Sequence, residues 1–131
     1  GSDAATFIRN ICMMPELARV EAAQLQWRLL PEDVLQLSSV VCSSIQHLEF
    51  VDCDLSDELL PLFLSCFVNV KNLNLSENNF TVIPECIKEC RFLTTLTLDY
   101  CDHLQEIRWI RPNLKYFSAL GCGALSSSSR S

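Results

Sequence analysis

The chain has 131 residues, of which 49% are hydrophobic and only 3 are Gly and 5 Pro, which predicts one ordered domain large enough to bury a core. Its formal net charge is −6 and its pI is about 4.8, so we expect it to bind neither nucleic acid nor an anionic membrane surface. The sequence contains no apolar run long enough to span a membrane.

Residues 1–43 do not follow the pattern that organises the rest of the chain. They begin with Gly-Ser and no Met, which we expect to be a cloning remnant on an excised fragment. An approximate helical spacing is present at Leu17, Val20, Gln24 and Trp27. We predict that this region is a degenerate repeat or a segment that covers the first repeat.

Residues 44–125 contain about four copies of one apolar pattern, L-x-x-L-x-L-x-x-N-x-L. The clearest copy begins at Val70. Others begin 25 residues earlier at Ile45, 23 residues later at Leu93, and a further 21 residues on at Leu114. This spacing and these periods are typical of leucine-rich repeats.

The pattern has a direct physical meaning. In L-x-L the two apolar side chains lie on one face of a short strand, and a single unit cannot bury that face, so the units must stack. The sequence therefore predicts an α/β fold, a leucine-rich-repeat solenoid with a short parallel sheet on its concave face and short helices or turns on its convex face. At the Asn position of the pattern, a polar side chain can bond the backbone of the turn, and a Cys can replace it as a weak donor. The residues at this position are Cys53, Asn78, Cys101 and Cys122.

The segments between strands have different patterns. An i, i+3, i+4 apolar spacing predicts short helices at 59–67 and 82–90, the first of them capped by Ser56 or Asp57. The third connection, 105–112, is shorter and is expected to be extended or a single turn.

The two ends of the repeat array lack clear capping units. Solenoids require polar capping repeats, and here the last repeat is followed by a Ser-rich tail at 126–131. We therefore expect self-association through exposed repeat ends.

The eight cysteines do not predict a disulfide framework, because most of them occupy apolar positions of the repeat. We expect them to be reduced, as in an intracellular protein. A zinc site built from Cys86, Cys90, Cys101 and His103 is disfavoured because no C-x-x-C pair is present. A catalytic arrangement of a Cys with His103 and Asp99 has less support still. The sequence predicts no enzyme activity, no metal and no cofactor.

The outward positions of the strands form a ladder of mixed polar side chains, which suits recognition of a protein surface. Any single one of these residues is more often simply solvated, but for the face as a whole we predict binding. The columns of candidate residues are His47, Asn72, Thr95 and Tyr116; Glu49, Asn74, Thr97 and Ser118; and Val51, Ser76, Asp99 and Leu120.

Several phrases of the sequence resemble the C-terminal leucine-rich repeats of plant, especially legume, immune receptors of the TIR, nucleotide-binding, leucine-rich-repeat family. They are MMPEL at 13–17, CDLSDELLP at 53–61, NVKNLNLSENNFTVIPECIKEC at 69–90, and CDHLQEIR and PNLKYFSALGC within 101–122. The resemblance implies an intracellular protein, cytoplasmic or nuclear, whose repeats sense pathogen effectors and help to hold an ADP/ATP switch off. Its partner would be an effector or the receptor's own nucleotide-binding domain. The resemblance supplies no catalytic or nucleotide-binding residue for this chain.

Two further functions remain open on the sequence alone. One is a leucine-rich-repeat adaptor or substrate receptor of another complex, such as a ubiquitin ligase. The other is an enzyme, which has the least support.

One segment departs from the family's E-I-R-G-I-P-P-N-L form. Trp109 and Arg111 stand where a Gly and a Pro are expected. Trp adopts left-handed backbone angles less readily than Gly, so the turn is expected to differ. Trp109 is alternatively a candidate anchor for a partner.

Overall fold

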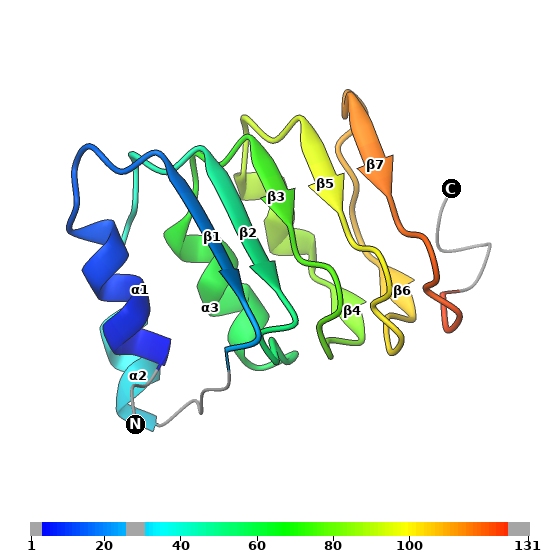
Figure 1. Ribbon diagram of the computed structural model, residues 1–131, viewed down its shortest axis with the longest axis horizontal. Helices are drawn as coiled ribbons and strands as arrows, with labels where there is room; N and C mark the ends of the chain where they lie inside the picture. Colours follow the sequence, from blue (N-terminus) through cyan, green and yellow to red (C-terminus); the bar gives the residue numbers. More distant parts are fainter. Residues whose placement is uncertain (1–3, 26–30, 126–131) are drawn as a thin grey trace.

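The computed structural model describes residues 4–25 and 31–125, and it contains a five-stranded parallel sheet (Figure 1). The predicted Ser-rich tail, the Gly-Ser pair and Trp27 lie outside the described residues. The strands of the sheet, in their spatial order, are β1 (Arg19–Ala23), β2 (His47–Val51), β3 (Asn72–Asn74), β5 (Thr95–Thr97) and β7 (Tyr116–Ser118). A second, two-stranded parallel sheet pairs β4 (Val82–Ile83) with β6 (Glu106–Ile107).

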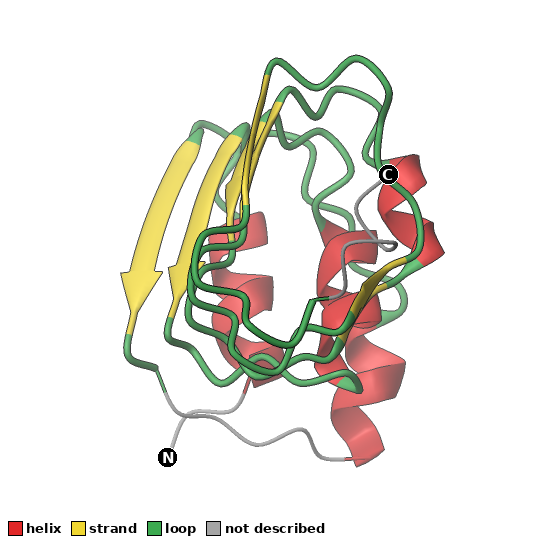
Figure 2. Ribbon diagram, turned by 90° about the vertical axis from the view of Figure 1, so that its right-hand side faces the viewer, coloured by secondary structure: helices red, strands yellow, loops and turns green. Residues whose placement is uncertain are grey.

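All the helices of the described chain lie on one side of the larger sheet, and its other face is open (Figure 2). They are α1 (Ala4–Cys12), α2 (Pro31–Leu37), α3 (Leu59–Cys66) and the 3₁₀ helix η1 (Glu85–Glu89). Helix α2 packs between α1 and α3, and α3 packs against η1. The fold is therefore of the mixed α/β class that the sequence predicts.

The core fills the space between the sheet and the helices. Leu48, Leu73 and Leu96 are paired in register on adjacent strands, and all three are buried. Phe50 and Phe63 meet edge to face with ring centroids 4.7 Å apart, which fastens β2 to α3. Leucines of the repeat pattern thus form the column that the L-x-L spacing predicts.

The N-terminal region does not form a helix at 19–23, although its approximate apolar spacing is helical. Residues 19–23 form strand β1, which is parallel to β2 with Val20 opposite Leu48 and Ala22 opposite Phe50. Small and β-branched residues therefore occupy the positions that leucine and phenylalanine hold in the next strand. Pairing with β2 overrides the weak helical pattern.

The connections agree in part with the sequence prediction. Helix α3 confirms the predicted helix, but its N-cap residue is Glu58, without a side-chain cap, and the Asp57 carboxylate instead accepts hydrogen bonds from Thr81. The helix expected at 82–90 is wrong in its first part, because residues 82–83 form β4 and only η1 is helical. Pro84 has the extended backbone angles φ −73° and ψ 159°, so the helix begins after it.

A left-handed residue follows each strand of the larger sheet and turns the chain toward the helical side. These residues are Gln24, Asp52, Glu77, Tyr100 and Gly121, with φ between 54° and 68°. A side chain at the last of these positions would collide with its neighbour, because a Cβ there would lie 2.4 Å from the Tyr100 ring. The turn therefore recurs in five successive units, one more than the sequence pattern reveals.

Asn78 is the most highly bonded side chain of the turns, and it is only 2% exposed. Its Oδ1 accepts hydrogen bonds from the backbone N–H groups of Cys53 and Leu55, both at 3.0 Å. Its Nδ2 donates to the carbonyl oxygens of Phe50 at 2.7 Å and Leu75 at 2.9 Å. The predicted role of this position is confirmed, and the amide joins two consecutive units.

Cysteines take the same position in the neighbouring units. The Cys101 thiol donates to the Leu75 carbonyl at 3.3 Å, and the Cys122 thiol donates to the Leu98 carbonyl at 3.0 Å. Each thiol thus reaches one carbonyl of the preceding unit. A thiol is a weaker donor than an amide and makes fewer bonds.

We expect Asn78→Ala to lower the free energy of unfolding by about 3 kcal/mol, because it leaves several buried backbone groups without partners. Urea denaturation followed by circular dichroism measures the change. The matched control is Asn79→Ala, since the Asn79 side chain is exposed and donates to the exposed Asp54 carboxylate. The control should lie within about 0.5 kcal/mol of the parent. Equal losses in the two variants would contradict the role assigned to Asn78.

Candidate functional site

The open face of the sheet carries the candidate residues in the predicted columns. Strand pairing sets His47 opposite Asn72, Asn72 opposite Thr95, and Thr95 opposite Tyr116. The second column is paired in the same way, from Glu49 through Asn74 and Thr97 to Ser118. The third column continues just beyond β3, β5 and β7, where the carbonyl groups of Ser76, Asp99 and Leu120 accept hydrogen bonds from backbone N–H groups in the turn of the preceding unit. The sequence alignment thus places these side chains correctly relative to one another.

A shallow hollow of about 130 Å³ lies in the middle of this face. His47 and Glu49 form one wall, Thr95 and Thr97 form the other, and Asn72 lies between them. At the far edge, the Tyr116 side chain is 54% exposed and Leu120 is 62% exposed. The open face therefore offers a polar centre with an aromatic and an aliphatic group beside it.

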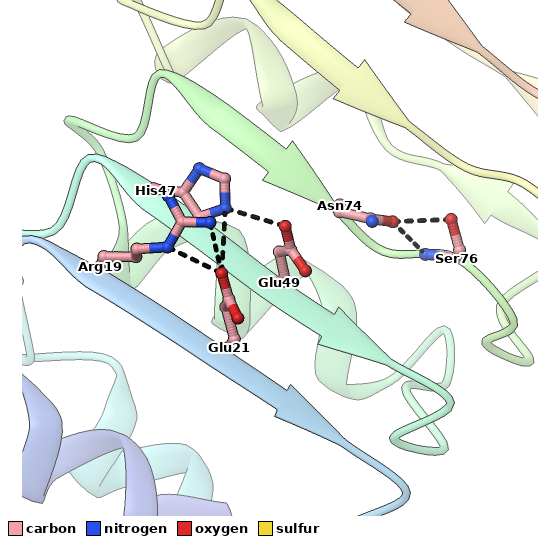
Figure 3. A network of polar contacts seen from close by, with 6 residues as sticks. All are labelled: Arg19, Glu21, His47, Glu49, Asn74 and Ser76. Atoms are coloured by element: carbon pink, nitrogen blue, oxygen red, sulfur yellow. Dashed lines mark hydrogen bonds and ion pairs between the residues drawn. The ribbon is translucent and has the colours of Figure 1, made fainter.

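Strand β1 adds charged residues that the sequence pattern does not reveal. Arg19 and Glu21 pair with His47 and Glu49 across the strands. The Arg19 guanidinium binds the Glu21 carboxylate, and His47 Nε2 lies 2.9 Å from a Glu49 oxygen and 4.0 Å from a Glu21 oxygen (Figure 3). Each carboxylate thus has a nitrogen partner, which offsets the repulsion between two acids on adjacent strands.

Among the described residues, this corner is also where three potential metal-ligand atoms lie close together. One ligand atom each from Glu21, His47 and Glu49 lies within 4.8 Å of the others. However, the Glu21 oxygen nearest His47 already accepts from Arg19. A cation would have to displace that guanidinium, so the corner is better described as an ion-pair network.

Several polar candidates are used inside the fold. The Ser76 hydroxyl donates to Asn74 Oδ1 at 2.6 Å (Figure 3) and accepts from the Asp99 backbone N–H at 3.0 Å. The Asp99 carboxylate then accepts from the Ser118 hydroxyl at 2.5 Å. Ser76 is 6% exposed and Ser118 is 9% exposed, so these two side chains are committed to the structure rather than to a partner.

Trp109 is half-buried and packs against the core. The Arg111 guanidinium lies over its ring at 5.4 Å and donates from Nη2 to the Cys90 carbonyl at 2.8 Å. Neither residue is among those with positive φ, so Trp109 does not adopt the left-handed angles that favour Gly. Trp109 supports Arg111 and the last turn, which makes it a poor candidate for a free anchor.

We expect Trp109→Ala to lower the free energy of unfolding by about 1–2 kcal/mol, because it removes half-buried apolar surface and a cation–π contact. Thermal unfolding measures the loss. Phe92→Ala is the control, since that ring is exposed and its loss should change stability by no more than about 0.5 kcal/mol. A stability of Trp109→Ala equal to that of the control would restore the anchor hypothesis.

Burial makes most of the cysteine side chains poor nucleophiles. All eight lie within the described part of the chain and are free thiols. Burial raises the pKa of Cys66, Cys90 and Cys101 from 9.0 to about 11 in each case. Burial also raises the pKa of Cys12 and Cys86. These five thiols therefore stay protonated, which suits packing and weak hydrogen-bond donation rather than catalysis.

These shifts predict a loss of stability at high pH. Below about pH 9 the three thiols are protonated in the folded and the unfolded chain alike and contribute no pH dependence. Between about pH 9 and 11 the unfolded chain loses these protons while the folded chain keeps them, so the free energy of unfolding falls. Urea denaturation at stepped pH measures this fall. Cys101→Val, which removes one of the thiols, should make it shallower; an unchanged slope would contradict the assignment.

Comparison with known proteins gives a consistent result. The family described as "Disease resistance protein RPS4B-like, leucine-rich repeats" matches residues 13–130. The chain is 32% identical over 68 residues to the probable disease resistance protein At4g19520 of Arabidopsis thaliana, which covers 52% of the chain and 4% of that protein. It is 32% identical over 71 residues to TMV resistance protein N of Nicotiana glutinosa, which covers 54% of the chain and 6% of that protein.

No solved structure matches the chain significantly. In the described ranges, no helix has both the length and the apolar character needed to cross a membrane. The resemblance noted in the sequence to the leucine-rich repeats of plant disease resistance proteins is confirmed by these matches.

Proposed function

Because the chain belongs to the family of leucine-rich repeats of RPS4B-like disease resistance proteins, we propose that it is a protein-recognition module of a plant intracellular immune receptor. In this proposal the repeats form part of a longer solenoid, and the open face of the sheet is its concave, partner-binding face. The module senses a pathogen effector and contributes to autoinhibition. It acts by binding and has no enzyme activity or cofactor of its own.

The observation that carries the proposal is the open sheet face. Its columns come from five strands held in register, so a partner meets side chains whose spacing is fixed in advance. Tyr116 is well suited to anchor a partner, because a rigid amphipathic ring buries a large area at low entropic cost. The hollow between His47 and Thr95 accepts a side chain from the partner.

The matched segment is a small part of each relative, 4% of one and 6% of the other. The activity of the whole receptor therefore rests on other domains, and the contribution proposed for this chain is recognition. Of the functions compatible with the sequence, an adaptor for another complex is less favoured, since one relative is named a probable disease resistance protein and the other a TMV resistance protein.

We expect the substitutions Thr95→Arg and Tyr116→Ala, made together in the full-length receptor, to abolish the response to its effector. The arginine fills the central hollow and the alanine removes the exposed ring. Cell death in leaf tissue with and without the effector measures the outcome. A response that appears without effector instead indicates loss of autoinhibition.

The matched control is Ser39→Arg with Leu35→Ala, which makes the same kinds of change at exposed positions in and just after α2. It should behave as the parent receptor does. If the open-face variant also behaves as the parent, the open face is not the recognition surface and the proposal fails.

A further inference from the structure

A basic groove lies at the edge of the sheet where β3, β5 and β7 begin, at the top of the view in Figure 1. Its volume is about 520 Å³. Four of its lining residues are cations, Lys71, Arg91, Arg111 and Lys115, and no acidic residue is among the described residues that line it. The chain has only 10 Lys and Arg and a net charge of −6, so this concentration of positive charge runs against its overall character.

The backbone fixes the spacing of two of these cations. The Thr94 N–H donates to the Lys71 carbonyl at 2.9 Å, and the Lys115 N–H donates to the Thr94 carbonyl at 2.8 Å. Lys71, Thr94 and Lys115 are therefore on successive rungs of the ladder. With adjacent strands about 4.8 Å apart, the two lysines lie two strand spacings from one another.

These four charges have no carboxylate partner in the part of the chain that the structure describes. The ion pairs found there involve Arg19, His47, Lys88 and Arg108 instead. Arg111 is held in place by carbonyl groups and by Trp109, while its Nε is buried and finds no acceptor among the described residues. Unpaired like charges gathered in one hollow attract a polyanionic ligand.

The groove also has an apolar border. Phe92 is 56% exposed and lines both the groove and a second hollow of about 320 Å³. Arg91 lines both hollows. An extended ligand crossing this edge would therefore meet cations and an exposed aromatic ring together.

We propose that this groove binds an acidic peptide segment of a partner protein, with an apolar side chain of that segment packed on Phe92. The groove shares no lining residue with the hollow of the open face, so this second surface is independent of the recognition surface proposed above. A peptide is favoured over a nucleic acid because the net charge of −6 repels a long polyanion, and because Glu89 lines the adjoining hollow.

The test uses the 131-residue chain and a labelled peptide of about 12 residues in which Glu and Asp alternate with Leu, long enough to span the groove when extended. Fluorescence anisotropy should show binding that weakens as salt is raised, because the attraction is electrostatic. A peptide with Lys in place of the acidic residues should not bind.

Lys115→Glu should weaken binding of the acidic peptide roughly tenfold, since it replaces an attraction with a repulsion. The control, Arg9→Glu, makes the same change of charge on α1 and should bind as the parent does. If Lys115→Glu does not fold, Lys71→Gln removes a groove charge more gently and should weaken binding several-fold.

Three results would overturn the proposal. The first is no measurable binding of the acidic peptide to the folded parent chain. The second is equal affinity in the groove variant and in Arg9→Glu. The third is tighter binding of a single-stranded oligonucleotide than of the peptide. None of these results tests the open-face proposal, because Thr95→Arg and Tyr116→Ala change no residue that lines the groove.

Discussion

The buried amide of Asn78 is the interaction on which the rest of the structure depends. A parallel sheet of very short strands leaves backbone N–H and C=O groups without partners wherever the chain turns toward the helices, and a buried unpaired group is costly. Asn78 bonds five such groups at once, three of them on the preceding unit. The turn, the strand register and the leucine column are consequently fixed together.

Fixing the register separates the polar residues of the sheet into two kinds. Ser76, Asp99 and Ser118 bond to one another and to the backbone across neighbouring units, so they extend the ladder beyond the short strands. His47 and Tyr116 remain accessible, the first beside the central hollow and the second at the edge. Recognition therefore depends on fewer side chains than the outward pattern indicates, because the Ser76 and Ser118 hydroxyls that complete the ladder are buried.

Much of the fold follows from the sequence because leucine spacing determines the strand positions and, through them, the columns of the open face. Strand β1 escapes detection because Val20 and Ala22 occupy its inward positions, and neither produces a leucine signal. The Arg19 and Glu21 network is missed with it. Residues 82–90 have helical spacing, but Pro84 is extended and leaves room only for a 3₁₀ turn. The role of Trp109 could not be predicted from the sequence either, because its packing depends on Arg111 and not on any repeat position.

The number of residues in each unit decides the conformation of its return segment. Measured between the left-handed residues from Gln24 to Gly121, successive units contain 28, 25, 23 and 21 residues. Each must return to the start of the next strand, and rise per residue grows from about 1.5 Å in an α-helix to about 2.0 Å in a 3₁₀ helix and about 3.3 Å in a strand. The return segments of the two longest units accordingly contain α2 and α3, that of the third contains η1, and that of the shortest contains only the two-residue strand β6. Strand pairing keeps the strand starts in register although the return segments differ, and it places basic residues of separate units along one edge of the sheet, where they line one groove.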